Sequence, residues 1–268
     1  MKKWMRAGAL ALAVGCVLLS GCGKEEPKAG GNTIHVVTHA NWNPFEYMEK
    51  GEIVGFDIDL TREAVKRAGL TMDLTDAGWE ALFEQIRSHQ ADMAVSGITI
   101  TPERQASYLF SKPYFISRQA ILVKEGADIH SAQDLMNGKE VAVQNGSTGQ
   151  EALEKLLGKN HPAIKKTPMS IQMLIGGQVD ALVGDETSVK AIMAQYPDQH
   201  LTIVYDDAAF TPEYFGLIYP KDQGEALQKK LDEALQSMIA DGTYGKLYEK
   251  WFKTPPTADV LERLKAGQ

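Results

Sequence analysis

Cysteine is scarce in this sequence of 268 residues, which contains only Cys16 and Cys22. Both lie close to the N-terminus, and the leader peptide described below would take Cys16 with it when it is removed. A mature chain whose one thiol is Cys22 cannot form a disulfide framework or a cysteine-rich metal site. No other metal-ligand spacing and no phosphate loop stands out in the sequence, and we expect neither a metal ion nor a cofactor.

Positive charge is also in short supply, because 28 Lys and Arg residues stand against 35 Asp and Glu residues, for a formal net charge of −7 at pH 7. Lys2, Lys3 and Arg6 belong to the predicted leader, so the mature chain would keep 25 basic residues against the same 35 acids, a net charge of −10. A chain this acidic is a poor binder of nucleic acid.

Long apolar runs are limited to one, at the N-terminus. Residues 7–20 are uniformly small or apolar behind a short basic segment, which suits the core of a signal peptide and is too short to span a bilayer. The run ends in LSGC (19–22), which resembles the lipobox of bacterial lipoproteins. The resemblance implies that residues 1–21 are removed and that Cys22 carries two or three acyl chains, palmitate among them, which anchor the protein to the cell membrane on its extracytoplasmic side. An ordinary cleaved signal with a chance cysteine stays open.

Residues 22–32 follow as a charged segment rich in Gly and Pro, with little to bury, and we expect a flexible tether. What remains is about 235 residues, enough for one large domain or two smaller ones.

Strands and helices alternate through this remainder, which predicts α/β units with parallel sheets. The expected strands are 34–38, 91–95, 119–123, 140–144, 180–184 and 213–220, and the expected helices are 56–69, 79–88, 150–157, 170–177 and 186–195.

Two segments of the first half are echoed, in the same order, in the second half. They are QADMAVSG (90–97) with QVDALVGD (178–185), and HVVTHANWN (35–43) with EVAVQNGST (140–148). The alignment places Gly97 against Asp185 and His39 against Gln144. Because ligands of open α/β sheets bind beyond the carboxyl ends of the strands, two related lobes would face each other across a ligand cleft.

Arg104 is a candidate for an anion site. Thr101, Pro102 and Glu103 make a good helix start, so Arg104 would project near free backbone amides, with Thr99 beside it. A guanidinium suits a planar carboxylate, to which it can donate two parallel hydrogen bonds. An ordinary surface arginine is the alternative.

Asp185 is the candidate of opposite sign, since it ends the matching strand of the other lobe and could accept a cation, although a plain helix N-cap is the alternative. Ser147 and Thr148 lie between a strand and a helix and offer hydroxyl groups, or form an ordinary turn. An acid, a base and hydroxyls that converge on one cleft describe a receptor for the ammonium and carboxylate of an amino acid.

Trp42 and Trp79 each stand in a loop after a strand, where they could clamp the side chain of such a ligand. Packing in the core is the alternative for both tryptophans, and Phe45 is expected in the core.

The spans NWNPFEY, GEIVGFDIDL, DMAVSGITITPER, VAVQNGSTG and DALVGDE, in this order, resemble the polar-amino-acid family of bacterial extracytoplasmic solute-binding proteins, and most closely the arginine-binding lipoproteins of Gram-positive bacteria. The similarity covers residues 33–254. It implies a two-lobed, type II periplasmic-binding-protein-like α/β fold, with lobe 1 at 33–116 plus 212–254, lobe 2 at 117–211, a two-strand hinge near 114–118 and 210–214, and a C-terminal tail at 255–268.

The resemblance also implies roles for the charged residues. Arg104 would pair with the α-carboxylate of the ligand, helped by Thr99 and by the hydroxyl and amide of Thr148. The carbonyl of Gly97 and the carboxylate of Asp185 would accept the α-ammonium. The expected function is that of a monomeric receptor that delivers an amino acid to the membrane permease of an ABC importer.

Position 39 departs from the family pattern. Members that select cationic or amide side chains usually carry Asp there, whereas this chain has His39, and an imidazole cannot replace that acceptor for a guanidinium. The departure argues against arginine or lysine specificity and leaves glutamine, histidine, cystine and other ligands open. Trp42 and Trp79 would sandwich that side chain, and Glu46, Gln144 and Gly184 could shape the far end of the pocket.

Two other functions are compatible with the sequence. An enzyme on the same fold, such as a dehydratase, would need a general acid or base, for which His39 and Glu46 are the candidates; we expect no enzyme. The binding partner of a separate membrane sensor is the other alternative.

Overall fold

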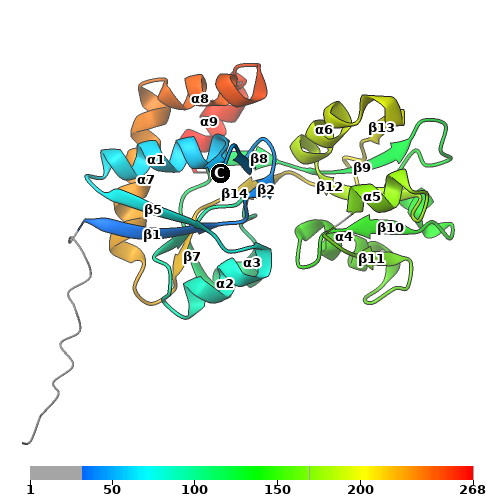
Figure 1. Ribbon diagram of the computed structural model, residues 1–268, viewed down its shortest axis with the longest axis horizontal. Helices are drawn as coiled ribbons and strands as arrows, with labels where there is room; N and C mark the ends of the chain where they lie inside the picture. Colours follow the sequence, from blue (N-terminus) through cyan, green and yellow to red (C-terminus); the bar gives the residue numbers. More distant parts are fainter. Residues whose placement is uncertain (1–31, 169, 268) are drawn as a thin grey trace, which may run out of the picture. The chain divides into compact units, whose positions relative to one another are not determined.

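The computed structural model describes residues 32–168 and 170–267 of the protein. The predicted leader, the lipobox cysteine and nearly all of the predicted tether lie outside the described residues. Two five-stranded sheets organise the rest, each in its own lobe (Figure 1). None of the described helices combines the length and the apolar character that a membrane span requires.

The sheet of lobe 1 has the strand order β5-β1-β6-β15-β7, with β1 parallel to β5 and β6, and β15 antiparallel to its two neighbours. Its strands are β1 (Thr33–Thr38), β5 (Thr71–Asp76), β6 (Met93–Ala94), β7 (Tyr108–Phe110) and β15 (Ile218–Pro220).

Successive residues of a strand point to opposite sides of the sheet, so this sheet has apolar side chains on both faces. Helices cover both faces. Val36 packs with α1, α7 and α8, and Val37 packs with α2. The helices of lobe 1 are α1 (Phe56–Arg67), α2 (Trp79–Arg87), α3 (Pro102–Ser107), α7 (Glu225–Ala240), α8 (Thr243–Phe252) and α9 (Ala258–Ala266). Most of the predicted C-terminal tail is therefore helix α9, whose Leu264 is buried in the lobe 1 core.

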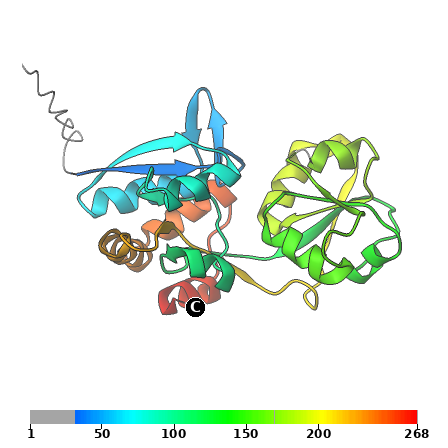
Figure 2. The same ribbon diagram turned by 90° about the horizontal axis from the view of Figure 1, so that it is seen from below.

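The sheet of lobe 2 has the order β11-β10-β12-β9-β13, and helices again lie on both of its faces (Figure 2). Its strands are β9 (Gln119–Lys124), β10 (Val141–Val143), β11 (Ile164–Lys166), β12 (Ala181–Asp185) and β13 (Leu201–Val204). Its helices are α4 (Thr148–Leu157), α5 (Ser170–Ile175) and α6 (Glu186–Gln195), with short 3-10 helices η1 (Ala132–Met136) and η2 (Pro197–Gln199).

Two short antiparallel strands connect the lobes, β8 (Phe115–Ser117) and β14 (Glu213–Phe215), and we call this pair the connecting ladder. The single strand predicted over 213–220 is wrong in this respect: β14 pairs with β8, and the chain then passes Gly216 and enters the lobe 1 sheet as β15. A Cβ on Gly216 would lie 3.0 Å from Phe110 Cδ1, so the chain passes close to its neighbours at this glycine.

A small three-stranded sheet, β2 (Asn41–Trp42), β3 (Glu46–Glu49) and β4 (Glu52–Val54), precedes α1. It carries the NPFEY segment and brings Glu46 to the start of α1. The two-lobed, mixed α/β architecture predicted from the sequence is confirmed.

Candidate functional site

Arg104 is buried, with 9% of its surface exposed, so the alternative of a surface arginine is wrong. Thr101 caps helix α3 by accepting a hydrogen bond from the amide of Arg104 (3.2 Å), with Pro102 at the first helical position. This local geometry turns the guanidinium inward, where Nη1 donates to the carbonyl of Thr99 (3.0 Å) and Nη2 donates to the carbonyl of Gly146 (3.1 Å). Arg104 therefore touches both lobes.

The guanidinium of Arg104 has no ionic partner among residues 32–168 and 170–267, where no carboxylate oxygen lies within 4.0 Å. The rings of Trp79 and Phe83 lie 5.5 and 5.6 Å from its Cζ atom. Burial lowers the pKa of Arg104, and the negative charges of Glu151 and Glu213 partly oppose that effect. An anion brought to this guanidinium would meet a cation that is already desolvated.

Asp185 ends β12 and occupies the N-cap position of α6, as the alternative interpretation predicted, but its side chain makes no capping hydrogen bond. Its Oδ1 instead accepts a hydrogen bond from the hydroxyl of Ser117, on the connecting ladder (3.0 Å). Part of the residue is exposed, but protein atoms surround the carboxyl group. This burial, together with the negative charge of Glu213, raises the pKa of Asp185 to about 7.

The charges of Arg104 and Asp185 influence each other, since each shifts the pKa of the other toward its charged form. They do not form an ion pair. A buried cation and a buried carboxylate, supplied by different lobes, are thus close enough to interact without neutralising each other directly.

Glu213, which the sequence reasoning missed, lies between the same two lobes. One of its carboxylate oxygens, Oε2, accepts hydrogen bonds from the hydroxyl of Thr99 (3.0 Å), the hydroxyl of Thr148 (2.7 Å) and the side-chain amide of Gln119 (3.2 Å). The sequence offered only a weak signal for it, an acid at the start of a predicted strand near a predicted crossing between lobes.

The turn before α4 combines structural and candidate binding groups. The hydroxyl of Ser147 accepts from the amide of Gln150 (3.2 Å) and donates to the carbonyl of Gln144 (2.8 Å), so it is engaged within its own turn. Gly146 has a positive φ of 69°, and a Cβ there would lie 3.3 Å from Trp79 Nε1. Trp79 therefore lies against both this turn and Arg104.

Gly97 ends the segment after β6 with a positive φ of 51°. A Cβ at this position would lie 1.8 Å from Cζ3 of Trp42, so the indole ring requires glycine here. Trp42 is half-buried and stacks on Phe45 with 4.7 Å between ring centroids. The packing interpretation holds for this contact of Trp42, and it places the ring directly against Gly97.

A pair of fully buried carboxyl groups, Glu46 and Asp57, lies next to the backbone of Gly97. Asp57 Oδ2 accepts from the amide of Gly97 (2.9 Å) and from the hydroxyl of Tyr114 (2.6 Å), while Glu46 Oε1 accepts from the hydroxyl of Ser96 (2.6 Å). Burial, the charge of Asp57 and the hydrogen bond between the two carboxyl groups raise the pKa of Glu46 well above its usual range. The expectation that Glu46 shapes a pocket wall is wrong, because it is 0% exposed.

His39 is half-buried, and its amide donates to the hydroxyl of Ser96 (3.3 Å). Burial lowers the pKa of its imidazole, against the opposing effect of the negative charge of Asp76. The imidazole is therefore mainly neutral at pH 7. Asp76 itself ends β5 and accepts from the amide of Ala40 (3.1 Å).

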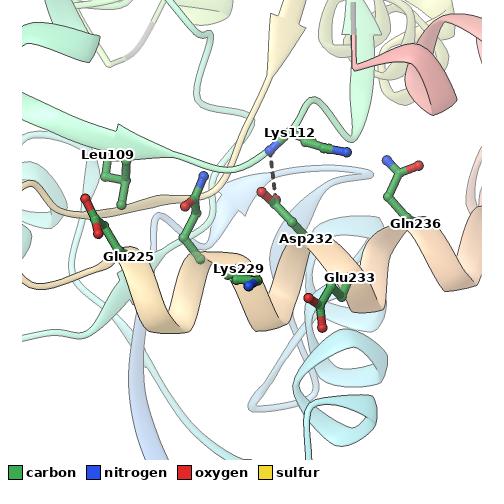
Figure 3. Close-up of a pocket in the computed structure, with 8 residues that line it drawn as sticks. Leu109, Lys112, Glu225, Lys229, Asp232, Glu233 and Gln236 are labelled. Carbon is green, nitrogen blue, oxygen red and sulfur yellow. Dashed lines mark hydrogen bonds between the residues drawn. The ribbon is translucent and has the colours of Figure 1, made fainter.

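A separate groove runs along α7 on lobe 1, where the amide of Lys112 donates to Asp232 (2.8 Å; Figure 3). Its lining residues are Leu109, Lys112, Glu225, Gln228, Lys229, Asp232, Glu233 and Gln236. None of the candidate site residues borders this groove. The described residues also contain no group of three or more His, Cys, Asp or Glu placed to hold a metal ion.

Comparison with known proteins assigns this arrangement to a family. The family model of the bacterial extracellular solute-binding proteins, family 3, matches residues 34–254. The chain belongs to this family. The membership predicted from the sequence is confirmed, and the match spans both lobes and the connecting ladder.

Relatives of this solute-binding protein cover nearly all of its length. It is 34% identical to a probable histidine-binding protein of Neisseria gonorrhoeae, over 94% of this chain and 96% of that one. It is 30% identical to the arginine-binding extracellular protein ArtP of Bacillus subtilis, over 94% and 98%. The crystal structure of ArtJ, an arginine-, lysine-, histidine-binding protein of Geobacillus stearothermophilus, superimposes with a TM-score of 0.82 at 45% identity, over 86% of this chain and 99% of that one.

Proposed function

We propose that this solute-binding protein binds an L-α-amino acid between its two lobes and delivers it to the membrane permease of an ABC importer. The observation that carries the proposal is the pair of opposite charges at Arg104 and Asp185, each desolvated and each without a direct ionic partner in the described chain. An uncompensated buried charge is costly, so a ligand that neutralises both charges at once is strongly favoured over one that neutralises neither.

In this proposal, Arg104 binds the α-carboxylate and Asp185 binds the α-ammonium, with the carbonyl of Gly97 as a second acceptor. The hydroxyls of Thr99 and Thr148 complete the carboxylate site, and both already point at a carboxylate oxygen, that of Glu213. Ser147 contributes through its turn, since its hydroxyl is occupied by capping.

The side chain of the ligand would lie between Trp42 and Trp79. Trp42 is held against Gly97, and Trp79 is held against Arg104 and Gly146, so both rings border the backbone and side-chain groups that would bind the ammonium and the carboxylate. His39 would lie toward the far end of the side chain. The named ligands of the relatives make arginine, histidine and lysine the first candidates for this chain.

The lobes, 33–116 plus 212–254 and 117–211, would close on the ligand by bending at the connecting ladder. Hinge closure of two domains around a ligand is an established type of motion. Closure removes the charge pairs from water and so strengthens them.

We further propose that Cys22 is the lipid-modified first residue of the mature protein and holds a monomeric receptor at the cell membrane. The support is the basic start, the apolar run of residues 7–20 and the LSGC sequence. Mass spectrometry of the intact protein from membranes would show the acyl mass on Cys22, and a Cys22→Ala variant would be recovered free of the membrane.

The function is tested by a thermal-shift screen of the mature chain against the twenty amino acids, since a ligand that binds the folded state raises the melting temperature. Isothermal titration then compares wild type with Arg104→Ala, which we expect to lose binding by about 100-fold or more, because a buried charged partner is removed. Arg87→Ala is the matched control, since Arg87 is an exposed arginine on α2 that pairs with Glu84. Retained affinity in Arg104→Ala would contradict the proposal.

A further inference from the structure

Glu213 is the first residue of β14, and two strand pairings place it at the candidate site. The connecting ladder pairs Glu213 with Ser117, and an isolated bridge pairs Thr99 with Phe215, two residues beyond Glu213. The carboxylate therefore projects from the connection between the lobes. It reaches Thr99 of lobe 1 and Thr148 of lobe 2 with the same oxygen.

The groups that bind Glu213 are suited to any carboxylate. Two hydroxyls and one side-chain amide all donate to Oε2, at 2.7 to 3.2 Å. Under the proposed function, two of these donors, the hydroxyls of Thr99 and Thr148, are the ones that the α-carboxylate of the ligand needs. A hydroxyl has one proton to donate, so each can serve one carboxylate at a time.

We propose that Glu213 is a resident competitor of the ligand, a carboxylate that occupies the hydroxyls of Thr99 and Thr148 and must release them when the α-carboxylate of an amino acid binds. This inference rests on the proposed function and adds to it a residue that sets affinity and selectivity. Glu213 lowers the affinity of the protein for amino acids. It thereby reduces the ratio between the affinity for an amino acid and the affinity for the same molecule without its α-carboxylate.

The charges at the site support this assignment. The negative charges of Glu151, Glu213, Asp185 and Glu103 all act on Arg104, and the charge of Glu213 also raises the pKa of Asp185. The α-carboxylate of a ligand would add a further negative charge beside Glu213 and Asp185. Removing the charge of Glu213 relieves that repulsion, and it weakens the hold on the two hydroxyls, because a neutral amide oxygen accepts more weakly than a carboxylate does.

The same geometry predicts the opposite effect on a ligand that lacks the α-carboxylate. Such a ligand leaves the hydroxyls of Thr99 and Thr148 with Glu213, and the negative charge of Glu213 remains near Arg104 and attracts the ammonium. Replacing Glu213 by glutamine removes that attraction. The variant should therefore bind amino acids more tightly and their α-amides no better or more weakly.

The test is isothermal titration of wild type and Glu213→Gln with two pairs of probes, L-arginine with L-argininamide and L-histidine with L-histidinamide. For a pair whose amino acid binds wild type, we expect about three- to tenfold tighter binding of the amino acid by the variant, the net worth of roughly one ordinary hydrogen bond. The affinity of the variant for the amide should be unchanged or lower, so the ratio between the two probes widens.

Glu103→Gln is the matched control, because Glu103 is an exposed acid beside Arg104, influences its charge and makes no hydrogen bond to either hydroxyl. We expect its affinities to stay within about twofold of wild type, since exposed charges contribute little. If Glu213→Gln bound the amino acid no better than wild type while Glu103→Gln was unchanged, the competitor role would be overturned.

A second variant, Glu213→Asp, keeps the charge but is one methylene shorter, so its carboxylate cannot bridge both hydroxyls. Its affinity for the amino acid should increase by less than that of Glu213→Gln. Glu213→Asp replaces Glu213→Gln in the titrations if circular dichroism shows that Glu213→Gln is unfolded. Wild type that binds none of the twenty amino acids in the thermal-shift screen would overturn the proposed function and this inference together. Wild type that binds, with no gain in either variant, would overturn this inference alone.

Discussion

The part of the chain that the structure describes holds two interacting pairs of carboxyl groups whose surroundings differ. Glu46 and Asp57 lie side by side inside lobe 1 and accept hydrogen bonds from Ser96, Gly97 and Tyr114 of the same lobe. Asp185 and Glu213 lie where the lobes meet, and their donors come from both lobes and from the connecting ladder: Thr99, Ser117, Gln119 and Thr148.

The difference shows what each pair can do. In the first pair, the raised pKa of Glu46 favours its protonated form, and Asp57 accepts hydrogen bonds from the amide of Gly97 and the hydroxyl of Tyr114 within the same lobe. In the second pair, Asp185 has no cation bonded to it, and its raised pKa reports that cost. The first pair finds its hydrogen-bond donors within one lobe, whereas under the proposed function a ligand with a positive charge completes the second pair.

The largest expected effect comes from Asp185→Asn. Loss of the carboxylate should weaken amino-acid binding by about 100-fold or more, as for other buried partners of a bound charge. The same variant should be more stable than wild type without ligand at pH 8. The folded-state pKa of about 7 exceeds the unfolded value of about 4, so the charged form of Asp185 destabilises the fold above that window.

Isothermal titration and urea unfolding at pH 5 and pH 8 measure both effects, with exposed Asp198→Asn as the matched control. We expect a gain at pH 8 of about 1 kcal/mol or more, and a smaller one at pH 5. Unchanged affinity together with unchanged stability would remove the distinction between the two pairs.

Glu46→Gln should have the reverse profile, a change in the pH dependence of stability with little change in binding. Because the pKa of Glu46 is raised in the folded state, the folded protein holds a proton that the unfolded chain releases near pH 4, and wild type loses stability as the pH rises above that value. A glutamine keeps the bonds to Ser96 and Asp57 without a proton to lose.

Urea unfolding between pH 5 and pH 8 should therefore show a flatter profile for Glu46→Gln, by up to about 1.4 kcal/mol per pH unit while that proton titrates. Asp185 is present in both proteins and cancels from the difference. Parallel profiles for the two proteins would show that Glu46 carries no such proton in the folded state. That result would contradict the raised pKa assigned to Glu46.

The smallest expected effect concerns the end of the ligand that neither pair touches. His39→Asp should improve the affinity for L-arginine relative to L-glutamine by a few-fold, about 1 kcal/mol, because a carboxylate replaces a mainly neutral imidazole. Titration with both amino acids gives the ratio. An unchanged ratio would place His39 outside the part of the site that selects the side chain.

Sequence reasoning reached the lobes and the two charges for identifiable reasons. Strand periodicity placed Gly97 and Asp185 at matching strand ends, and the Thr-Pro-Glu helix start set the position of Arg104 on α3. Such features are local, or they repeat along the chain, so a single sequence contains them.

The missed features are all long-range contacts. Glu213 meets Thr99 and Thr148 across 114 and 65 residues, and Glu46 meets Asp57 only because β3 is brought against the start of α1. The segment 213–220 forms two strands because β14 pairs with β8 and β15 pairs with β7, which lie far from it in the sequence. Each depends on which segments the fold brings together, and no spacing in the sequence encodes that.

The most direct test of the account is a crystal structure with the amino acid that gives the largest thermal shift. The account predicts the α-carboxylate within hydrogen-bond distance of the Arg104 guanidinium, and the α-ammonium within hydrogen-bond distance of the Asp185 carboxylate. A ligand bound with either charged group turned away from these two side chains, or bound elsewhere on the protein, would contradict it.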